Sequence, residues 1–223
     1  MPHAHPPLPQ PDSAEPLSPR DFARWYGPWE PLTPATIADF LDGFDRPWWI
    51  VGGWALEKAT GVSRAHEDMD VSVAHSDAEA LRIFLRDRGW TTWNADSGWL
   101  RPFDDRFREI RSDSGIWVRA DATSPWVLDI PLTPFRGGRW TNKRLPEQEH
   151  DLDEVTWIGE DGLRYLNPEI VLFMKMWQSR AKDVLDAERT LHLLSAPQKH
   201  WLAAAVGAVD PEHPWAEVSP AAP

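Results

Sequence analysis

The 223-residue sequence contains no cysteine, no long apolar run and fewer basic than acidic side chains. Without cysteine, disulfide bonds and thiolate zinc sites are excluded, which is typical of a protein that works in a reducing compartment. The first 20 residues lack the apolar stretch of a signal peptide, and no segment is long enough to cross a bilayer. We therefore expect a cytoplasmic protein without a membrane partner.

The formal net charge is −12, from 23 Lys and Arg against 35 Asp and Glu. An acidic surface repels the phosphates of nucleic acids, and the sequence shows no basic stripe, so a nucleic-acid partner is not expected. The same charge suits a cationic small molecule. Composition therefore favours a small, positively charged substrate over a polyanionic one.

The distribution of proline divides the chain. Ten of the 22 prolines fall within the first 34 residues, and hydrophobic residues make up 42% of the sequence, which is enough for a core. We predict four segments: a disordered proline-rich lead-in over 1–21, a mixed α/β domain over 22–158, a helical C-terminal domain over 159–217, and a tail over 218–223.

Hydrophobic periodicity predicts the elements within these segments. A helix should start at the Thr33-Pro34 cap, and another should follow the capping box of Ser76 and Glu79. The charged stretch 134–153 is predicted to be a long loop. The remaining predictions are helices over 54–59 and from 167 onward, and strands over 48–51, 68–74, 90–93, 116–120, 126–130 and 155–158.

A D-x-D pattern on the second predicted strand is the first candidate site. Side chains alternate along a strand, so Asp68 and Asp70 share one face, while Met69 and Val71 face the core. Adjacent carboxylates repel each other, and a divalent cation with a preference for hard oxygen ligands, such as Mg²⁺, removes that repulsion. The alternative is a strand end with two solvated acids.

A glycine pair, Gly52-Gly53, precedes this strand at a strand-to-helix junction. Backbone N–H groups at such a junction bind phosphate, and glycine lets a ligand approach the backbone closely. Arg64, in the connecting loop, is either a phosphate clamp or an ordinary surface arginine. The spacing of glycines and acids therefore predicts a nucleotide phosphate beside a metal ion.

Asp129 is the third candidate carboxylate. In the predicted strand 126–130, the apolar residues face the core and leave Asp129 on the opposite face. It could bind a metal, act as a general base, or do both, the alternative being a strand-end acid without such a role.

A second D-x-D, Asp151 and Asp153 after His150, has neither an apolar strand nor a glycine turn before it. We interpret it as a solvated acidic loop. His66 is predicted to orient the loop or a ligating carboxylate rather than to bind metal, or else to be a polar turn histidine.

The motif G-G-W-A from Gly52, followed by R-x-H-x-D-x-D from Arg64, resembles the nucleotidyltransferase superfamily of the polymerase-β type. Within it, the chain is similar to the aminoglycoside 2''-adenylyltransferase-like and lincosamide nucleotidyltransferase-like branch. The likeness extends over roughly residues 35–215, including the stretches 100–102, 162–168, 182–183 and 213–215. Ser63 replaces a frequent threonine, and the proline-rich lead-in is not a family feature.

The resemblance implies an α+β protein with a polymerase-β-like nucleotidyltransferase fold, in which a small mixed sheet with flanking helices is followed by a helical domain. Asp68 and Asp70 would hold Mg²⁺, with Asp129 as third ligand and base. Gly52 and Gly53 would cradle the β- and γ-phosphates of ATP. Arg64 would assist, and Lys182 would either reach the phosphates or form a surface salt bridge.

The implied reaction moves AMP from ATP to a hydroxyl of a small molecule, here an aminoglycoside, and releases pyrophosphate. Lincosamides are a less charged alternative, for which tryptophans near Trp99 would suit the apolar parts. Two other functions stay open: nucleotidylation of a protein in a toxin–antitoxin pair, and a catalytically inactive nucleotide-binding module. The acids considered for lining a cationic acceptor are Asp96, Asp104, Asp105, Glu169 and Asp183.

Overall fold

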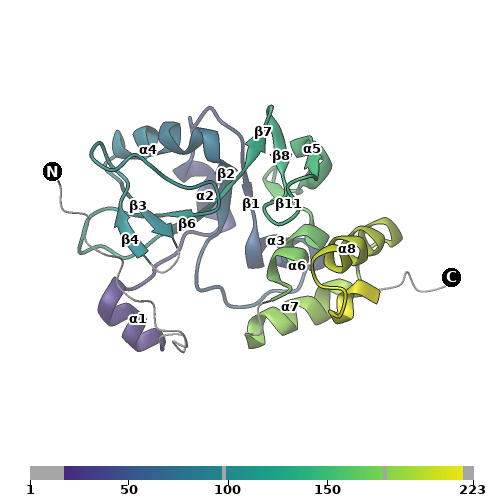
Figure 1. The fold of residues 1–223 in the computed structure, drawn as a ribbon. Coiled ribbons are helices and arrows are strands. Elements are labelled where there is room, and N and C mark those ends of the chain that lie inside the picture. Colours follow the sequence, from purple (N-terminus) through teal and green to yellow (C-terminus); the bar gives the residue numbers. More distant parts are fainter. Residues whose placement is uncertain (1–17, 97–98, 178–179, 218–223) are drawn as a thin grey trace, which may run out of the picture.

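Eight short strands form one mixed β-sheet in the computed structural model, which describes residues 18–96, 99–177 and 180–217. The strand order is β10-β11-β1-β2-β6-β5-β3-β4 (Figure 1). β1 pairs in parallel with β11, and β2 pairs in parallel with β6, while the other neighbours that are paired run antiparallel. The strands are β1 (Trp48–Ile50), β2 (Val71–Ala74), β3 (Thr91–Asp96), β4 (Trp99–Pro102), β5 (Gly115–Arg119), β6 (Leu128–Thr133), β10 (Thr156–Ile158) and β11 (Arg164–Leu166).

Helices gather at two ends of this sheet (Figure 1). α4 packs on β3, whereas α3 packs on α6 and α7, and α6 packs on α8. The α+β class is thereby confirmed. The helices are α1 (Pro19–Tyr26), α2 (Pro34–Phe40), α3 (Gly52–Thr60), α4 (Ala78–Arg86), α5 (Leu152–Val155), α6 (Pro168–Lys175), α7 (Ala181–Leu191) and α8 (Ala196–Val209), with 3-10 turns η1 (His75–Asp77) and η2 (Pro214–Glu217).

Local sequence signals explain most helix boundaries. α2 starts after the Thr33 cap, and α3 ends at Gly61, whose φ of 69° is the left-handed conformation that glycine favours. The capping box predicted for Ser76 and Glu79 is wrong. The 3-10 turn η1 occupies that position, and Glu79 instead accepts two hydrogen bonds from Arg82.

The stretch 134–153 is not the long loop that its composition predicts. It contains a three-stranded sheet of β7 (Phe135–Arg136), β8 (Arg139–Thr141) and β9 (Glu149–His150). Its apolar anchor is Trp140, which is 2% exposed within an otherwise charged segment. Because strands of two or three residues carry almost no periodicity, composition alone gave the wrong prediction here.

The boundary predicted after residue 158 falls inside a β-hairpin. β10 pairs with β11, which in turn pairs with β1, so the large sheet continues to Leu166. The helical part begins at Pro168. We therefore propose that the α/β unit extends to about residue 167. The predicted tail and residues 1–17 of the predicted lead-in lie outside the described residues, while Pro19–Tyr26 forms helix α1 rather than a disordered segment.

The alternation predicted for the central strands is found in the core. Met69, Val71 and Val73 are fully buried, as are Trp126, two residues before β6, and Leu128, its first residue. Burial of apolar area at about 25 cal/mol per Å² is the main favourable term for such a sheet. The opposite faces of the same strands are left for polar side chains, and these include the candidate acids.

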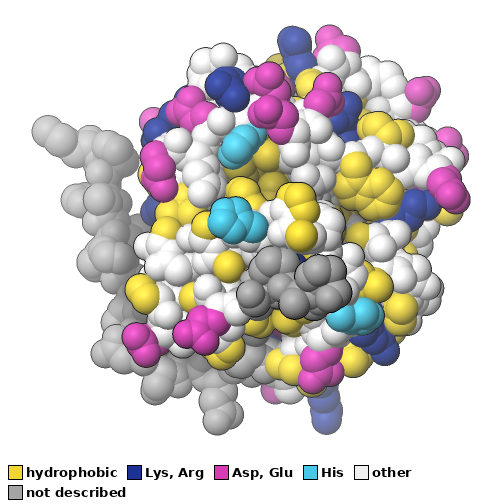
Figure 2. Space-filling model, turned by 90° about the vertical axis from the view of Figure 1, so that its right-hand side faces the viewer, with side chains coloured by type: hydrophobic (Ala, Val, Ile, Leu, Met, Phe, Trp, Pro, Cys, Tyr) yellow, Lys and Arg dark blue, Asp and Glu magenta, His cyan; other side chains and the backbone are white. Residues whose placement is uncertain are grey.

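On the face around α8, acidic, basic and hydrophobic side chains are intermixed (Figure 2). Among the described residues, no helix combines the length and the apolarity that a bilayer crossing requires.

Candidate active site

The two glycines at the start of α3 make room for side chains. Gly52 has φ 64°, and a Cβ atom there would lie 2.1 Å from Oδ2 of Asp70. A Cβ on Gly53 would lie 2.1 Å from Nη2 of Arg64. Both contacts are far shorter than van der Waals distance, so each position excludes any residue larger than glycine unless its neighbour moves. The glycine pair thus brings the backbone of α3 against the D-x-D segment.

Backbone pairing brings the acids of two strands together. Asp70 and Asp129 form an isolated parallel β-bridge, in which the Asp129 N–H donates to the carbonyl of Met69 at 2.9 Å. The Val51 N–H donates to the Asp70 carbonyl at 3.0 Å, which ties this bridge to β1. Asp68 lies just before the strand, and its carbonyl accepts from the Trp54 indole at 3.1 Å.

Asp68, Asp70 and Asp129 all line one cavity of about 630 Å³ between the large sheet, the β8–β9 turn and α6. Gly52 also lines this cavity, whereas Gly53 lies behind it, beside Arg64. The structure therefore brings together the three acids and one glycine that the sequence predicts.

The three carboxylates interact unfavourably in the absence of a cation. Burial, together with Asp129 and Asp68, raises the pKa of Asp70 well above its ordinary value. Burial and the charge of Asp68 raise the pKa of Asp129 to about 7, and a hydrogen bond from the Trp117 indole acts in the opposite direction. Crowded acids of this kind are stabilised by a bound cation.

Among the residues that the structure describes, no three His, Cys, Asp or Glu side chains form a ready three-ligand metal site. The donor chemistry nevertheless fits Mg²⁺. This ion is commonly held in nucleotide sites by one or two carboxylates together with phosphate oxygens, rather than by an all-protein cage. Asp70 and Asp129, with Asp68 nearby, would supply the carboxylate ligands of such a site, and the nucleotide phosphates would supply the other oxygen ligands.

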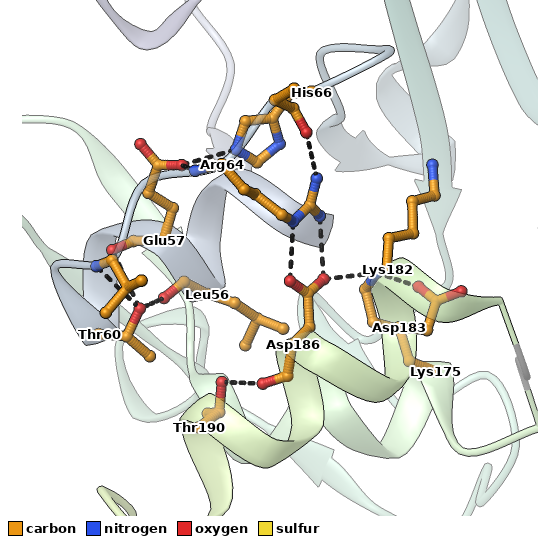
Figure 3. A network of polar contacts seen from close by, with 12 residues as sticks. Leu56, Glu57, Thr60, Arg64, His66, Lys175, Lys182, Asp183, Asp186 and Thr190 are labelled. Atoms are coloured by element: carbon orange, nitrogen blue, oxygen red, sulfur yellow. Dashed lines mark hydrogen bonds and ion pairs between the residues drawn. The ribbon is translucent and has the colours of Figure 1, made fainter.

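Arg64 does not point into the cavity. Its Nε and Nη2 donate to Oδ1 and Oδ2 of Asp186 at 2.8 and 2.9 Å, and its Nη1 donates to the Ala65 carbonyl (Figure 3). The side chains of Arg64 and Asp186 are only 13% and 6% exposed. The structure thus matches neither alternative from the sequence, since this arginine forms a buried link to α7.

His66 follows the orienting alternative. Its Nε2 lies 2.8 Å from Oε2 of Glu57, and its ring stacks on Trp54 at 3.8 Å between centroids. Glu57 also accepts hydrogen bonds from the Arg64 N–H and the Ser63 hydroxyl, both at 3.0 Å. Burial lowers the pKa of His66. One α3 carboxylate therefore fixes the loop that leads to Asp68.

Lys182 follows its salt-bridge alternative. Its ammonium lies 2.7 Å from Oε2 of Glu67, and it does not line the cavity of the three acids. The cations that do line this cavity were not predicted from the sequence. They are Lys143, Arg144, Lys175 and Arg180. The consecutive basic residues Lys143 and Arg144 were the available signal, but they lie in the charged segment 134–153, which the sequence predicts to be a loop.

Of the five acids considered for an acceptor, Asp96 alone lines a hollow next to the candidate site. This groove of about 270 Å³ shares Asp129 and Lys143 with the main cavity and is also lined by Trp117. Trp99 faces Asp96 across β3 and β4. Asp96 also lies 3.8 Å from Nε of Arg111. The other four acids bind residues elsewhere: Asp104 binds Arg106, Asp105 binds Arg82, Glu169 accepts from Gln198, and Asp183 binds Lys175 and Arg180.

The acids of the rival D-x-D are solvated, as predicted, but they belong to the start of helix α5 rather than to a loop. Asp151 caps α5 and pairs with Arg139, while Asp153 pairs with Arg164. Their side chains are 74% and 84% exposed. A further hollow of about 320 Å³ near α3 and α7 has no titratable residue in its described lining.

The fold is similar to that of known nucleotidyltransferases, and the chain places acids just before β2 and within β6, beside a glycine junction. Residues 35–131, less than half of the chain, match the sequence model of the family described as aminoglycoside-2''-adenylyltransferase, which confirms the resemblance to this branch. That segment contains Gly52, Asp68, Asp70 and Asp129. No curated protein matches the chain.

Two solved structures of ANT(2'')-Ia share the fold at low identity. A crystal structure of ANT(2'')-Ia in complex with adenylyl-2''-tobramycin has a TM-score of 0.53 and 16% identity, covering 78% of this chain and 94% of that one. A solution structure of the antibiotic-resistance factor ANT(2'')-Ia gives 0.51 and 16%, covering 78% and 89%. The lincomycin-bound lincosamide adenylyltransferase LnuA gives 0.49 and 16%, covering 74% and 100%.

Proposed function

We propose that this chain transfers AMP from ATP to a hydroxyl group of a small cationic molecule, with an aminoglycoside antibiotic as the acceptor. The observation that carries the proposal is the pairing of Asp70 and Asp129 across β2 and β6, in one cavity with Asp68. Burial and mutual repulsion raise the pKa values of Asp70 and Asp129, and a bound cation would offset that repulsion. The family match over residues 35–131 supports the same reaction class.

In the proposed step, the acceptor oxygen attacks the α-phosphorus of ATP. A new oxygen–phosphorus bond forms, the bond from the α-phosphorus to the bridging oxygen breaks, and pyrophosphate leaves. The proton of the acceptor hydroxyl passes to the carboxylate of Asp129. Magnesium held by Asp68, Asp70 and Asp129 together with phosphate oxygens would neutralise charge on the phosphates.

We propose that the acceptor molecule binds in the groove that shares Asp129 with the main cavity. A hydroxyl placed there lies next to the proposed base, so its proton can pass to Asp129 as the oxygen attacks. Asp96 and Asp113, both within ion-pair distance of Arg111, and Asp129 contribute carboxylates to this groove, and Trp117 gives it an aromatic wall. Opposite charge favours a polycationic acceptor over a neutral one. The description of the matched family and the adenylylated tobramycin bound to ANT(2'')-Ia support an aminoglycoside.

We also propose that the protein acts in the cytoplasm, where ATP is available and a cysteine-free chain has no need of oxidation. The alternatives of a protein target and of an inactive nucleotide-binding module are outcomes of the test below. The shared cavity of the three acids favours catalysis over loss of activity.

The test is pyrophosphate release from ATP and Mg²⁺ with a panel of aminoglycosides and lincosamides. We expect release with aminoglycosides and identification of an acceptor that has gained AMP by mass spectrometry. Asp68→Ala and Asp129→Asn serve as matched controls without turnover. ATP binding without turnover on any acceptor would favour the inactive module, and labelling of a protein instead of a drug would favour the macromolecular target.

A further inference from the structure

Two of the four cations that line the active-site cavity, Lys175 and Arg180, are paired with acids of the helical part. The ammonium of Lys175 lies 2.6 Å from Oδ1 of Asp183 and 3.3 Å from Oδ2 of Asp186. Arg180 binds Asp183 at 2.6 Å. These acids are 3% and 5% exposed, so they hold their cations in place and reduce the positive charge available to a ligand.

Lys143 and Arg144, in the turn between β8 and β9, differ from them. Within the described residues, neither side chain forms a hydrogen bond or an ion pair within 4.0 Å. Lys143 is partly buried and lines both the main cavity and the groove beside Asp129. Arg144 is exposed at the rim, where its guanidinium stacks on the Trp177 ring at 3.9 Å. Stacking fixes the plane of the guanidinium and leaves its N–H donors available.

Without an anionic partner, the partly buried position of the Lys143 ammonium is energetically unfavourable. A lysine is seldom buried without a partner, because its ammonium loses hydration. Burial lowers the pKa of Lys143, and the charges of Asp113 and Asp129 only partly oppose this effect. A ligand that supplies anionic oxygens inside the cavity would compensate the loss of hydration.

The turn that carries this pair is held rigidly. Asn142 is fully buried, donates from Nδ2 to Oε1 of Gln148 at 3.0 Å, and accepts at Oδ1 from the Arg144 N–H at 3.0 Å. The Gln148 N–H donates to the Leu145 carbonyl at 2.8 Å. A turn cross-linked in this way presents two consecutive basic residues at a fixed place, as expected of a preorganised binding element.

We propose that Lys143 and Arg144 bind the β- and γ-phosphates of the nucleotide, and hence the leaving pyrophosphate. Lys143 lines both the main cavity and the groove beside Asp129, and Arg144 lies at the outer rim, so the phosphates would lie on the main-cavity side of Lys143, opposite the acceptor groove. Arg64 is held by Asp186, and Lys182 pairs with Glu67 and does not line the cavity. The inference rests on the proposed function, since it names the part of that site which holds the triphosphate.

The experiment measures binding of inorganic tripolyphosphate and of ATP to the full chain by calorimetry, each in the presence of Mg²⁺. The variants are Lys143→Met, which keeps the length and apolar stem of the side chain, and Arg144→Gln. The matched control is Arg139→Gln in β8, which removes an equal charge from the same small sheet but does not line the cavity. Thermal melting verifies that each variant is folded.

We expect each variant to bind tripolyphosphate and ATP about 10- to 100-fold more weakly, as for the loss of one charge-assisted phosphate contact, with the control unchanged. Affinities within twofold of the wild type for folded Arg144→Gln and Lys143→Met would overturn the inference. If Lys143→Met does not fold, Arg144→Gln decides alone.

Turnover of the wild type separates this inference from the proposed function. If the wild type transfers no nucleotide but binds tripolyphosphate in a Lys143-dependent manner, the anion site stands and the proposed reaction fails. If the wild type transfers AMP and the variants bind both probes normally, the reaction stands and the anion site fails. A wild type that binds neither probe overturns both.

Discussion

Two groups of basic residues lie near the same acids but are held in opposite ways. Arg64 and Lys175 share the carboxylate of Asp186 in a network that joins the loop before Asp68 to α7 (Figure 3). Lys143 and Arg144, across the cavity, have no acidic partner within ion-pair distance among the described residues. The first group connects parts of the chain, and the second remains available for a ligand.

The difference shows that closeness to the D-x-D motif in sequence does not determine whether a basic residue is available to bind a ligand. Arg64 is four residues from Asp68 and was one candidate phosphate ligand, yet two hydrogen bonds commit it to Asp186. Lys143 is distant from the motif in sequence and lies beside Asp129 in space. Partners in the tertiary structure, which sequence spacing does not show, distinguish the two.

The largest effect is expected from removing the acids that both groups of cations surround. Asp70→Ala should reduce turnover by at least about 1,000-fold, because the metal and phosphates lose a central ligand. The fold should stay intact, since Asp70 is under repulsion from Asp68 and Asp129. Steady-state pyrophosphate release together with urea unfolding checks both statements. Turnover within tenfold of the wild type would contradict the site.

Asp186→Ala tests the connecting group. It leaves Arg64 without its carboxylate in a largely buried position, and we expect a loss of about 3–5 kcal/mol in the free energy of unfolding. Urea unfolding monitored by tryptophan fluorescence measures this loss. Lys143→Met should lose far less by the same measurement. Equal losses for the two variants would remove the distinction between the groups.

Gly52→Ala tests the close approach of α3 to the acids. Its Cβ would lie 2.1 Å from Asp70 at a backbone with φ 64°, so we expect a loss of about 1–3 kcal/mol and weaker Mg²⁺-dependent ATP binding. Gly61→Ala is the matched control, because it has φ 69° and nothing within 4 Å of a new Cβ. If both variants behave alike, backbone strain accounts for the effect and the contact with Asp70 does not.

The pH dependence of stability tests the acidic side of the cavity. Asp129 has a pKa of about 7 in the fold, above its ordinary 3.8, so the native state binds a proton that the unfolded chain releases between these values. Stability of the metal-free protein should therefore decrease as pH rises from about 4 to 7. Asp129→Asn should flatten this slope, measured by urea unfolding at several pH values. An unchanged slope would contradict the crowding of the acids.

Lys182→Ala should have the smallest effect. Its partner Glu67 is 77% exposed, and such an ion pair contributes about 0–1 kcal/mol. ATP affinity should change less than threefold, measured by the same calorimetry as for Lys143→Met. A loss of tenfold or more would return Lys182 to the phosphate site and weaken the contrast with the β8–β9 turn.

Sequence reasoning was sufficient where a local pattern determines the outcome. The alternation around Met69 and Val71, and the same pattern around Asp129, predicted which side chains leave the core. The glycine junction at the start of α3 was also visible, because helix signals follow a short apolar strand. The neighbourhood of β2 and β6 was expected only through the family resemblance, since the two strands are about 60 residues apart in the chain.

Other features depend on contacts that no local pattern encodes. β11 was missed because three residues that lie between a turn and a helix cap show no period. The small sheet of β7, β8 and β9 was missed for the same reason. The partners of Arg64 and the isolation of Lys143 follow from where α7 and the β8–β9 turn pack. Such contacts need the folded chain, and they decide which cations serve a ligand.

The most direct measurement is a crystal structure of Asp129→Asn with Mg²⁺ and ATP. The account predicts a metal ion between Asp70 and the phosphates, with the α-phosphorus beside residue 129 and the β- and γ-phosphates on Lys143 and Arg144. A nucleotide bound away from Asp70, or phosphates held by Arg64 and Lys182, would contradict it.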